Sequence, residues 1–142
     1  VLRAPLIAVP RLGVINVHGA LLPDLRGPFP AFWTLALGAP PGVTVHAIDS
    51  EELDTGPILL QRAVAPIAGE TVLALDARLL AEGARMVAEV VARIEAGTAA
   101  PQPQPAGAGR YLGYPARGAV AAFRTRGGRF QRWRDVARLI RA

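Results

Sequence analysis

The segment Val14-Ile15-Asn16-Val17-His18 constrains the fold most, because apolar and polar residues alternate along it. Alternate residues of a β-strand project from the same face of a sheet. If this segment is a strand, Asn16 and His18 point the same way. An amide donor beside a titratable imidazole can bind an oxyanion and move a proton, and a carboxylate arriving from Asp54 would complete the set.

The pattern on either side of this segment predicts an α/β domain with short connections. Residues 1–12 are expected to form a short helical turn, and residues 19–30, rich in proline and glycine, a loop. Further on we expect a helix from about Phe29 to Leu37 ended by Gly38, a strand over 43–48, an acidic loop over 49–56, a strand over 58–64 antiparallel to the one before it, and a long helix from Thr71 to about Ala96.

The two faces of the long helix differ in chemistry. Charges of alternating sign recur every three or four residues and predict a solvated face, at Arg78, Glu82, Arg85, Glu89 and Arg93. The other face is apolar and is expected to pack on the core, through Leu75, Leu79, Met86, Val87, Val90 and Ile94.

The last third of the chain differs from the rest in composition. Residues 101–109 begin with Pro-Gln-Pro-Gln-Pro and indicate an extended linker between a domain over 1–100 and a C-terminal extension over 110–142. In the extension, 120–130 suggests a β-hairpin that turns at Gly127-Gly128, and 133–140 suggests a short amphipathic helix.

Composition excludes several classes of protein. The chain has 142 residues, 51% of them hydrophobic, which suits one globular domain, and it contains no cysteine for a disulfide or a thiolate metal site. No apolar stretch is long enough to span a membrane and no secretory signal is evident, so we expect a cytoplasmic protein. All sixteen basic residues are arginine. Residues 110–142 contain nine arginines and one acidic residue, whereas residues 1–109 contain seven arginines and ten acidic residues.

Four ordered motifs resemble the folate-dependent formyltransferase family, which transfers a formyl group from 10-formyltetrahydrofolate to an amine. The resemblance runs from about Pro10 to Gly97. The motifs are Gly-Val-Ile-Asn-Val-His-Gly-Ala-Leu-Leu-Pro over 13–23, Arg-Gly at 26–27, Gly-Val-Thr-Val-His over 42–46, and Leu-Asp-Thr-Gly-Pro-Ile-Leu-Leu-Gln over 53–61. It implies the C-terminal half of a formyltransferase-type mixed sheet flanked by helices.

The resemblance also assigns the catalytic residues, as Asn16, His18 and Asp54. In that assignment Asn16 donates to the oxyanion, where losing one donor typically costs about 2.7–4 kcal/mol of barrier. A cationic His18, favoured by Asp54, stabilises the same charge and shuttles the proton. Substrate or cofactor contacts are implied, without a metal, for Thr44, His46, Leu22, Arg26, Gly56 and Gln61.

Other interpretations of the same residues stay open. His18, His46 and Asp54 are conceivable zinc ligands, although the two histidines come from different strands and the set contains no close ligand pair. Asp54-Thr55-Gly56 also forms an Asx-turn sequence and matches the aspartic-protease triplet, which requires a second, facing aspartate. The alternative function is a non-catalytic lobe that binds RNA or another polyanion through its arginines, with its aromatic residues either stacking on bases or forming a small satellite core.

Two departures from the family pattern matter. Ala20 stands where many members have serine. The half of the catalytic domain that comes first in the family is missing from this sequence, and with it the acceptor's phosphate contacts. The strand over 14–17 would be internal in the complete sheet, so we expect an open edge that drives self-association or binding of a missing N-terminal half. The acceptor is left open among an amino sugar nucleotide, another small amine and methionyl-tRNA.

Overall fold

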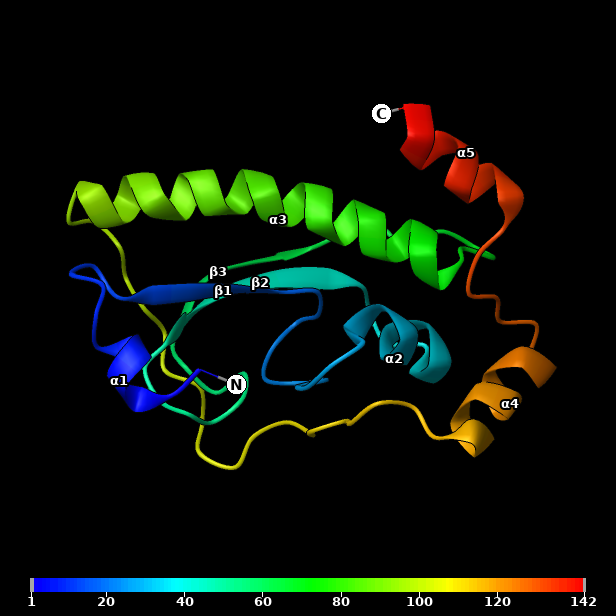
Figure 1. Cartoon of the computed structure of the whole chain (residues 1–142), viewed down its shortest axis with the longest axis horizontal. Coiled ribbons are helices and arrows are strands. Elements are labelled where there is room, and N and C mark those ends of the chain that lie inside the picture. The colour runs from blue at the N-terminus through cyan, green and yellow to red at the C-terminus, as the bar shows by residue number, and fades with distance from the viewer. Residues whose placement is uncertain (1, 142) are drawn as a thin grey trace.

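Three antiparallel strands form the centre of the computed structural model, which describes residues 2–141 (Figure 1). They are β1 (Val14–His18), β2 (Gly42–Ile48) and β3 (Ile58–Ala63), in the order β1-β2-β3. The helices are α1 (Ala4–Ile7), α2 (Pro30–Leu37), α3 (Val72–Glu95), α4 (Arg117–Thr125) and α5 (Trp133–Arg141). The expected strands and the first three helices are therefore confirmed to within a few residues.

The strand register sorts polar and apolar side chains onto opposite faces of the sheet. Asn16 pairs with His46, and His18 pairs with Thr44, which in turn pairs with Gln61 on β3. Because directly paired residues of antiparallel strands project from the same face, these five polar side chains gather on one face. Val17 projects from the other face and packs toward the core under α3.

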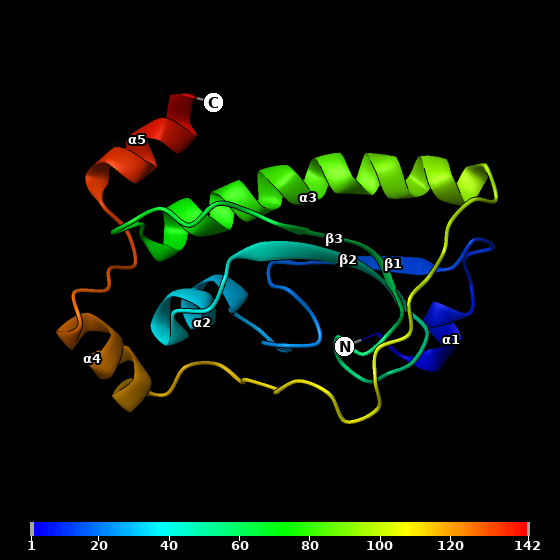
Figure 2. The same cartoon turned by 180° about the vertical axis from the view of Figure 1, so that it is seen from behind.

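Helix α3 begins where the Thr71 side chain accepts a hydrogen bond from the backbone N–H of Ala74. It lies along one face of the sheet, and Figures 1 and 2 show this from opposite sides. Its apolar stripe is buried as expected, at Leu75, Leu79, Met86 and Val90. Its charged stripe is paired, with Glu82 and Glu89 each binding an arginine of α3 and both also binding Arg62 of β3.

The predicted hairpin over 120–130 is wrong, because residues 117–125 form helix α4. Ala119, Val120 and Phe123 fall on one side of a helix, and all three pack against the core. Gly127 and Gly128 end the helix rather than turn a hairpin, since their N–H groups bond back to the carbonyls of Arg124 and Phe123. Helical periodicity and tertiary packing therefore override the glycine signal.

The C-terminal segment closes the N-terminal end of α3. The carbonyl oxygens of Arg129 and Phe130 accept hydrogen bonds from the first two N–H groups of α3. Asp135, buried on α5, accepts bonds from the Thr71 hydroxyl at 2.8 Å and from the Arg132 N–H at 2.7 Å. Phe123 and Phe130 also pack on Phe32 of α2 with ring centroids 5.1 and 5.7 Å away. Among the described helices, none is long and apolar enough to cross a bilayer.

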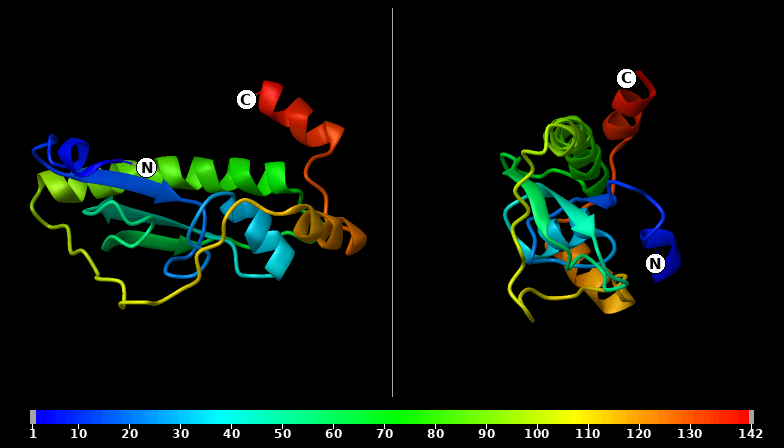
Figure 3. Two further views of the ribbon diagram at one scale, coloured as in Figure 1. Left: turned by 60° about the horizontal axis from the view of Figure 1, so that its bottom comes forward. Right: turned by 90° about the vertical axis from the view of Figure 1, so that its left-hand side faces the viewer.

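The chain between α3 and α4 runs back along the side of the sheet that faces away from α3 (Figure 3). It bonds to the end of the acidic loop through the backbone of Gln102 and Ile58, and to the loop after β1 through Arg26, Arg110 and Leu112. On the opposite side, the outer edge of β1 has no neighbouring strand within residues 2–141. The polar face is therefore bordered by a crossing segment, and the sheet has an open edge.

Gly83 sets how closely α3 approaches β1. A Cβ at this position would come within 2.5 Å of Val17 Cγ1, a branched side chain with little freedom to move. We expect Gly83→Ala to lower the free energy of unfolding, because overpacking of about 1–3 kcal/mol outweighs a gain in helix propensity of about 1 kcal/mol.

Urea denaturation followed by circular dichroism measures this difference. The matched control is Gly118→Ala in α4, where a Cβ meets nothing within 4 Å and a modest stabilisation is expected. Equal stabilisation of the two variants would contradict the close approach of α3 and β1.

Candidate functional site

The loop between β2 and β3 brings Asp54 to the polar face of the sheet. Asp54 adopts a left-handed backbone conformation with φ 58°, which is uncommon outside glycine. Its Oδ2 accepts a hydrogen bond of 2.7 Å from the N–H of Gly27, in the loop after β1. Gly56 allows the loop to return close to β2, since a Cβ there would clash with the Ala47 carbonyl. Two loops distant in sequence therefore fix one carboxylate.

His18 presents one ring nitrogen to this carboxylate. Its Nε2 lies 2.9 Å from the carbonyl oxygen of Leu25, and because a carbonyl can only accept, Nε2 carries a proton. The other nitrogen, Nδ1, lies 3.8 Å from Asp54 Oδ1. His18 is 5% exposed. The neutral ring therefore keeps an unshared electron pair on Nδ1, beside the carboxylate.

His46 approaches the same carboxylate oxygen from β2. Its Nδ1 donates to the Ala47 carbonyl at 2.8 Å, so the neutral ring accepts at Nε2. That Nε2 lies 3.2 Å from Asn16 Nδ2, which donates to it, and 3.6 Å from Asp54 Oδ1, a separation longer than a hydrogen bond. The contact orients the Asn16 amide and leaves its second N–H available for another acceptor.

Burial and charge act against each other on the ionisable groups. Burial lowers the pKa of His18 below its usual value, even though Asp54 and the Leu25 carbonyl act to raise it. Burial acts to raise the pKa of Asp54, but the rings of His46 and His18 and the Gly27 N–H together lower it below its usual value. Asp54 does favour a cationic His18, as expected, because its charge acts to raise the pKa of the ring. Desolvation of the ring is the larger effect, so the net pKa of His18 is lowered and burial disfavours the cationic ring expected from the sequence.

Asn16, His18 and Asp54 line one cavity of about 520 Å³. Its walls also include Asp76, Leu79 and Leu80 of α3, Pro28 of the loop after β1, Pro30 at the start of α2, and Tyr111 and Tyr114 of the segment before α4. The cavity therefore combines an apolar and aromatic wall with the three polar groups, which is a common composition for a ligand site.

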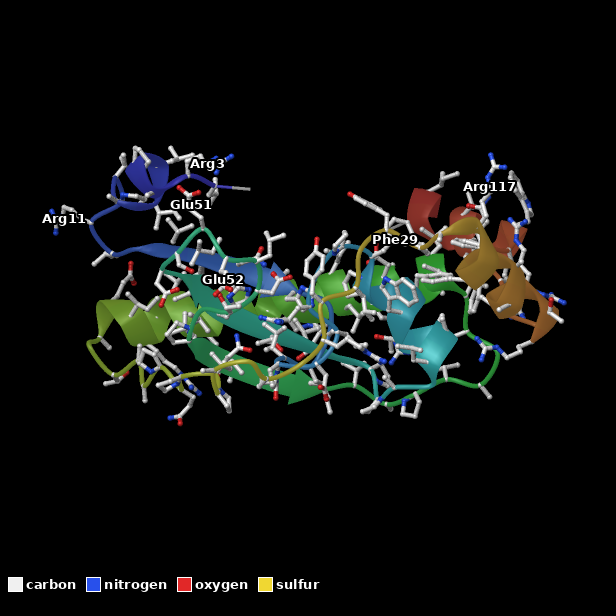
Figure 4. The ribbon with its side chains drawn as sticks, turned by 90° about the horizontal axis from the view of Figure 1, so that it is seen from below. Arg3, Arg11, Phe29, Glu51, Glu52 and Arg117 are labelled. Carbon is white, nitrogen blue, oxygen red and sulfur yellow. The ribbon has the colours of Figure 1, made fainter. Side chains whose placement is uncertain are left out.

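A second cavity of about 260 Å³ lies on the other side of the same residues. Asn16, Leu53 and Asp54 line both cavities, while His46 and Gly56 line only the second. Its remaining lining includes three acidic residues, Asp49, Glu51 and Glu52, beside the apolar residues Leu2, Ala47 and Ile48. Figure 4 looks onto the side of the sheet that faces away from α3. It shows Glu51 and Glu52 on the acidic loop, with Phe29 near the opposite end of the sheet.

The other residues assigned from the sequence lie in two places. Thr44, Gln61 and Leu22 form a hydrogen-bonded network, in which the Gln61 amide donates to the Thr44 hydroxyl and the Leu22 carbonyl, and Thr44 accepts from the Leu22 N–H. This network holds the loop after β1 and lines neither of the two cavities. Arg26 lines a separate cavity of about 430 Å³ on the far side of the acidic loop.

Sequence reasoning missed Asp76, Tyr111 and Tyr114 as cavity residues. Asp76 precedes the charged stripe of α3, and burial raises the pKa of its carboxyl. The two tyrosines belong to the arginine-rich extension, and no local pattern connects them with a strand almost a hundred residues earlier. Among residues 2–141, no group of histidine, cysteine, aspartate or glutamate has the arrangement of a metal site.

The lowered pKa of His18 predicts how stability depends on pH. The unfolded chain binds a proton at this histidine more readily than the folded protein, so the free energy of unfolding should fall as the pH drops below the ordinary value of 6.5. Asp54 contributes only at lower pH, because its folded pKa lies below 3.8. Urea titrations from about pH 8 to about pH 5 should show a weaker pH dependence in His18→Gln than in the wild type. Equal slopes would contradict this.

Comparisons with known proteins identify the family of this chain. The family model described as formyl transferase matches residues 1–91. The methionyl-tRNA formyltransferase of Koribacter versatilis is 48% identical over 101 residues, which cover 70% of this chain and 32% of that protein. The corresponding protein of Aromatoleum aromaticum is 38% identical over 114 residues, covering 80% and 36%. This chain thus spans about a third of the length of these curated relatives.

Solved structures give the same result. The formyltransferase PseJ from Anoxybacillus kamchatkensis, determined with UDP-4,6-dideoxy-4-formamido-L-AltNAc and tetrahydrofolate, superposes with a TM-score of 0.66 and is 33% identical, covering 73% of this chain and 54% of that one. Glycinamide ribonucleotide transformylase 1 from Symbiobacterium toebii has a TM-score of 0.62 and 34% identity, covering 67% and 45%. The chain belongs to the formyl transferase family.

Proposed function

We propose that this protein transfers a formyl group from 10-formyltetrahydrofolate to an amine, with Asn16, His18 and Asp54 as its catalytic residues. The observation that carries the proposal is the convergence of these three side chains on one cavity. The family membership supports it, as does the tetrahydrofolate bound by PseJ.

The chemistry follows from the hydrogen bonds of the three side chains. The amine nitrogen attacks the formyl carbon, and the free N–H of the Asn16 amide donates to the oxygen that becomes negative. Neutral His18 takes the proton from the attacking nitrogen at Nδ1, and Asp54, 3.8 Å away, stabilises the imidazolium that forms. The bond from the formyl carbon to the folate nitrogen then breaks, and His18 returns the proton to that nitrogen.

Two cavities that meet at Asn16 and Asp54 suit a reaction with two substrates. The smaller cavity carries the carboxylates of Asp49 and Glu52, which can accept hydrogen bonds from the amino and ring N–H groups of a folate. Glu51 also lines it, but its carboxylate already accepts from Arg3 and from the Ala4 N–H. The larger cavity, with its tyrosines, would then receive the acceptor. In this arrangement the formyl carbon lies between the two, next to the Asn16 amide.

The acceptor and the division of the chain are parts of the same proposal. The relatives include enzymes named for methionyl-tRNA and glycinamide ribonucleotide and one determined with a nucleotide sugar, so an amino sugar nucleotide, another small amine and methionyl-tRNA all stay candidates. We propose that residues 1–100 carry the catalytic side chains, that 101–109 connect them to the C-terminal part, and that 110–142 contribute to acceptor contacts through Tyr111 and Tyr114.

Single substitutions test the catalytic assignment. In an assay with 10-formyltetrahydrofolate and each candidate acceptor in turn, we expect Asn16→Ala to lower kcat by about 100- to 1,000-fold, the usual effect of removing an oxyanion donor. His18→Ala and Asp54→Asn should each abolish measurable transfer. Asp24→Asn is the matched control, because this exposed carboxylate lines neither cavity. Wild-type turnover in folded His18→Ala would overturn the assignment.

The open edge of β1 leads to a second proposal about partners. Unpaired backbone groups on an edge strand favour pairing with another strand, and β1 has no neighbour on that side within the described residues. We expect the chain to associate with a second copy or with a separate segment that supplies the missing strand. Sedimentation equilibrium over a concentration series would show self-association. A monomer at every concentration would exclude the second copy and leave only the separate segment as the partner of β1.

Binding of RNA or another polyanion is the alternative function, and the comparisons favour formyl transfer over it. Several arginines of the extension have structural contacts, such as Arg126, which donates to the Ala36 carbonyl, and Arg124, which lies 5.6 Å over the Phe130 ring. The catalytic proposal therefore accounts for more of the site.

A further inference from the structure

The segment Pro101–Pro105 lies against the loop that carries Asp54, and its two glutamines make different contacts. Gln102 uses its backbone, whose N–H and carbonyl both bond to Ile58 at 2.8 Å, just after the loop. Gln104 uses its side chain, which reaches into the loop itself. Figures 2 and 4 show this segment passing across the sheet on the side away from α3.

The Gln104 amide donates twice to the backbone of the loop. Its Nε2 lies 3.1 Å from the carbonyl oxygen of Asp54 and 2.8 Å from that of Gly56. Because both partners are carbonyl oxygens, only the NH₂ end of the amide can make these contacts, and the orientation of the side chain is settled. Gln104 therefore bridges the residues on either side of Thr55.

These contacts complete a set that holds Asp54 from two directions. The backbone of Asp54 is left-handed, a conformation that residues other than glycine rarely adopt without support from neighbouring groups. Gly27 binds Oδ2 of the carboxylate, and Gln104 binds the backbone carbonyl of the same residue. Oδ1 is then left facing His18 and His46.

We propose that Gln104 is a positioning residue that fixes the Asp54 carboxylate against the imidazole of His18. Prolines at 103 and 105 flank Gln104, and each restricts the backbone. Fixing the Gln104 side chain against the loop therefore costs little backbone conformational entropy. What looks like a linker in the sequence thus becomes part of the support of the site. The expected effect on catalysis rests on the proposed function, whereas the effect on His18 does not.

Histidine titration by NMR tests the proposal in the intact chain without any turnover. The variants are Gln104→Leu, which keeps most of the volume but has no donor, and Gln104→Ala. The matched control is Gln102→Leu, because the Gln102 side chain reaches only the Ala100 carbonyl, at 3.5 Å. The titratable groups around His18, namely Asp54, His46 and Asp76 across the cavity, are unchanged in all three variants.

Loss of the Gln104 contacts should let the Asp54 carboxylate move away from His18. Since that carboxylate raises the pKa of His18, we expect the titration of His18 to shift to lower pH in both Gln104 variants and to stay at the wild-type position in Gln102→Leu. Where turnover is measured, kcat should fall by up to about 100-fold with little change in KM, as for a misplaced catalytic group.

Three results would overturn the proposal. They are a wild-type His18 titration in folded Gln104→Leu, an equal shift in Gln102→Leu, and unfolding of both Gln104 variants while Gln102→Leu stays folded, which would make Gln104 a residue needed for folding. Absence of turnover in the wild type would count against the proposed function alone, because the titration is read independently.

Discussion

The Asp54 carboxylate, placed between two imidazoles and held by backbone groups, is the interaction on which the site depends. Each imidazole has one nitrogen bonded to a backbone carbonyl, so each presents its other nitrogen toward Oδ1. The Gly27 N–H takes the remaining carboxylate oxygen. Protonation of either ring therefore changes the charge balance at the same oxygen, and this couples the three groups.

The sheet can support this cluster because one of its faces is apolar and packs on the core, while the other is polar. One face packs its apolar side chains under α3, where Gly83 permits close approach to Val17. The other face carries paired polar residues, and two of them, Thr44 and Gln61, are used to hold the loop after β1. That loop in turn supplies the Gly27 N–H and the Leu25 carbonyl to the site.

The C-terminal third is built into the same structure. It adds Phe123 and Phe130 to the core, covers the first turn of α3, and contributes Tyr111 and Tyr114 to the larger cavity. Gln104 extends this pattern to the acidic loop. A segment with the composition of a linker and a basic tail therefore lies where it can affect both the stability of the fold and the geometry of the site.

By itself, the sequence determined the elements whose residues are periodic and the face that Asn16 and His18 share, because strand and helix periods are local properties of the backbone. It also indicated Asp54 through a motif of the family. Only the tertiary structure decided that Phe123 packs in the core and that desolvation outweighs Asp54 at His18. The tertiary structure likewise decided that Tyr111 and Tyr114 line the larger cavity and that Gln104 contacts the loop of Asp54. Each of these depends on groups far apart in the chain, whose burial and contacts no local pattern encodes.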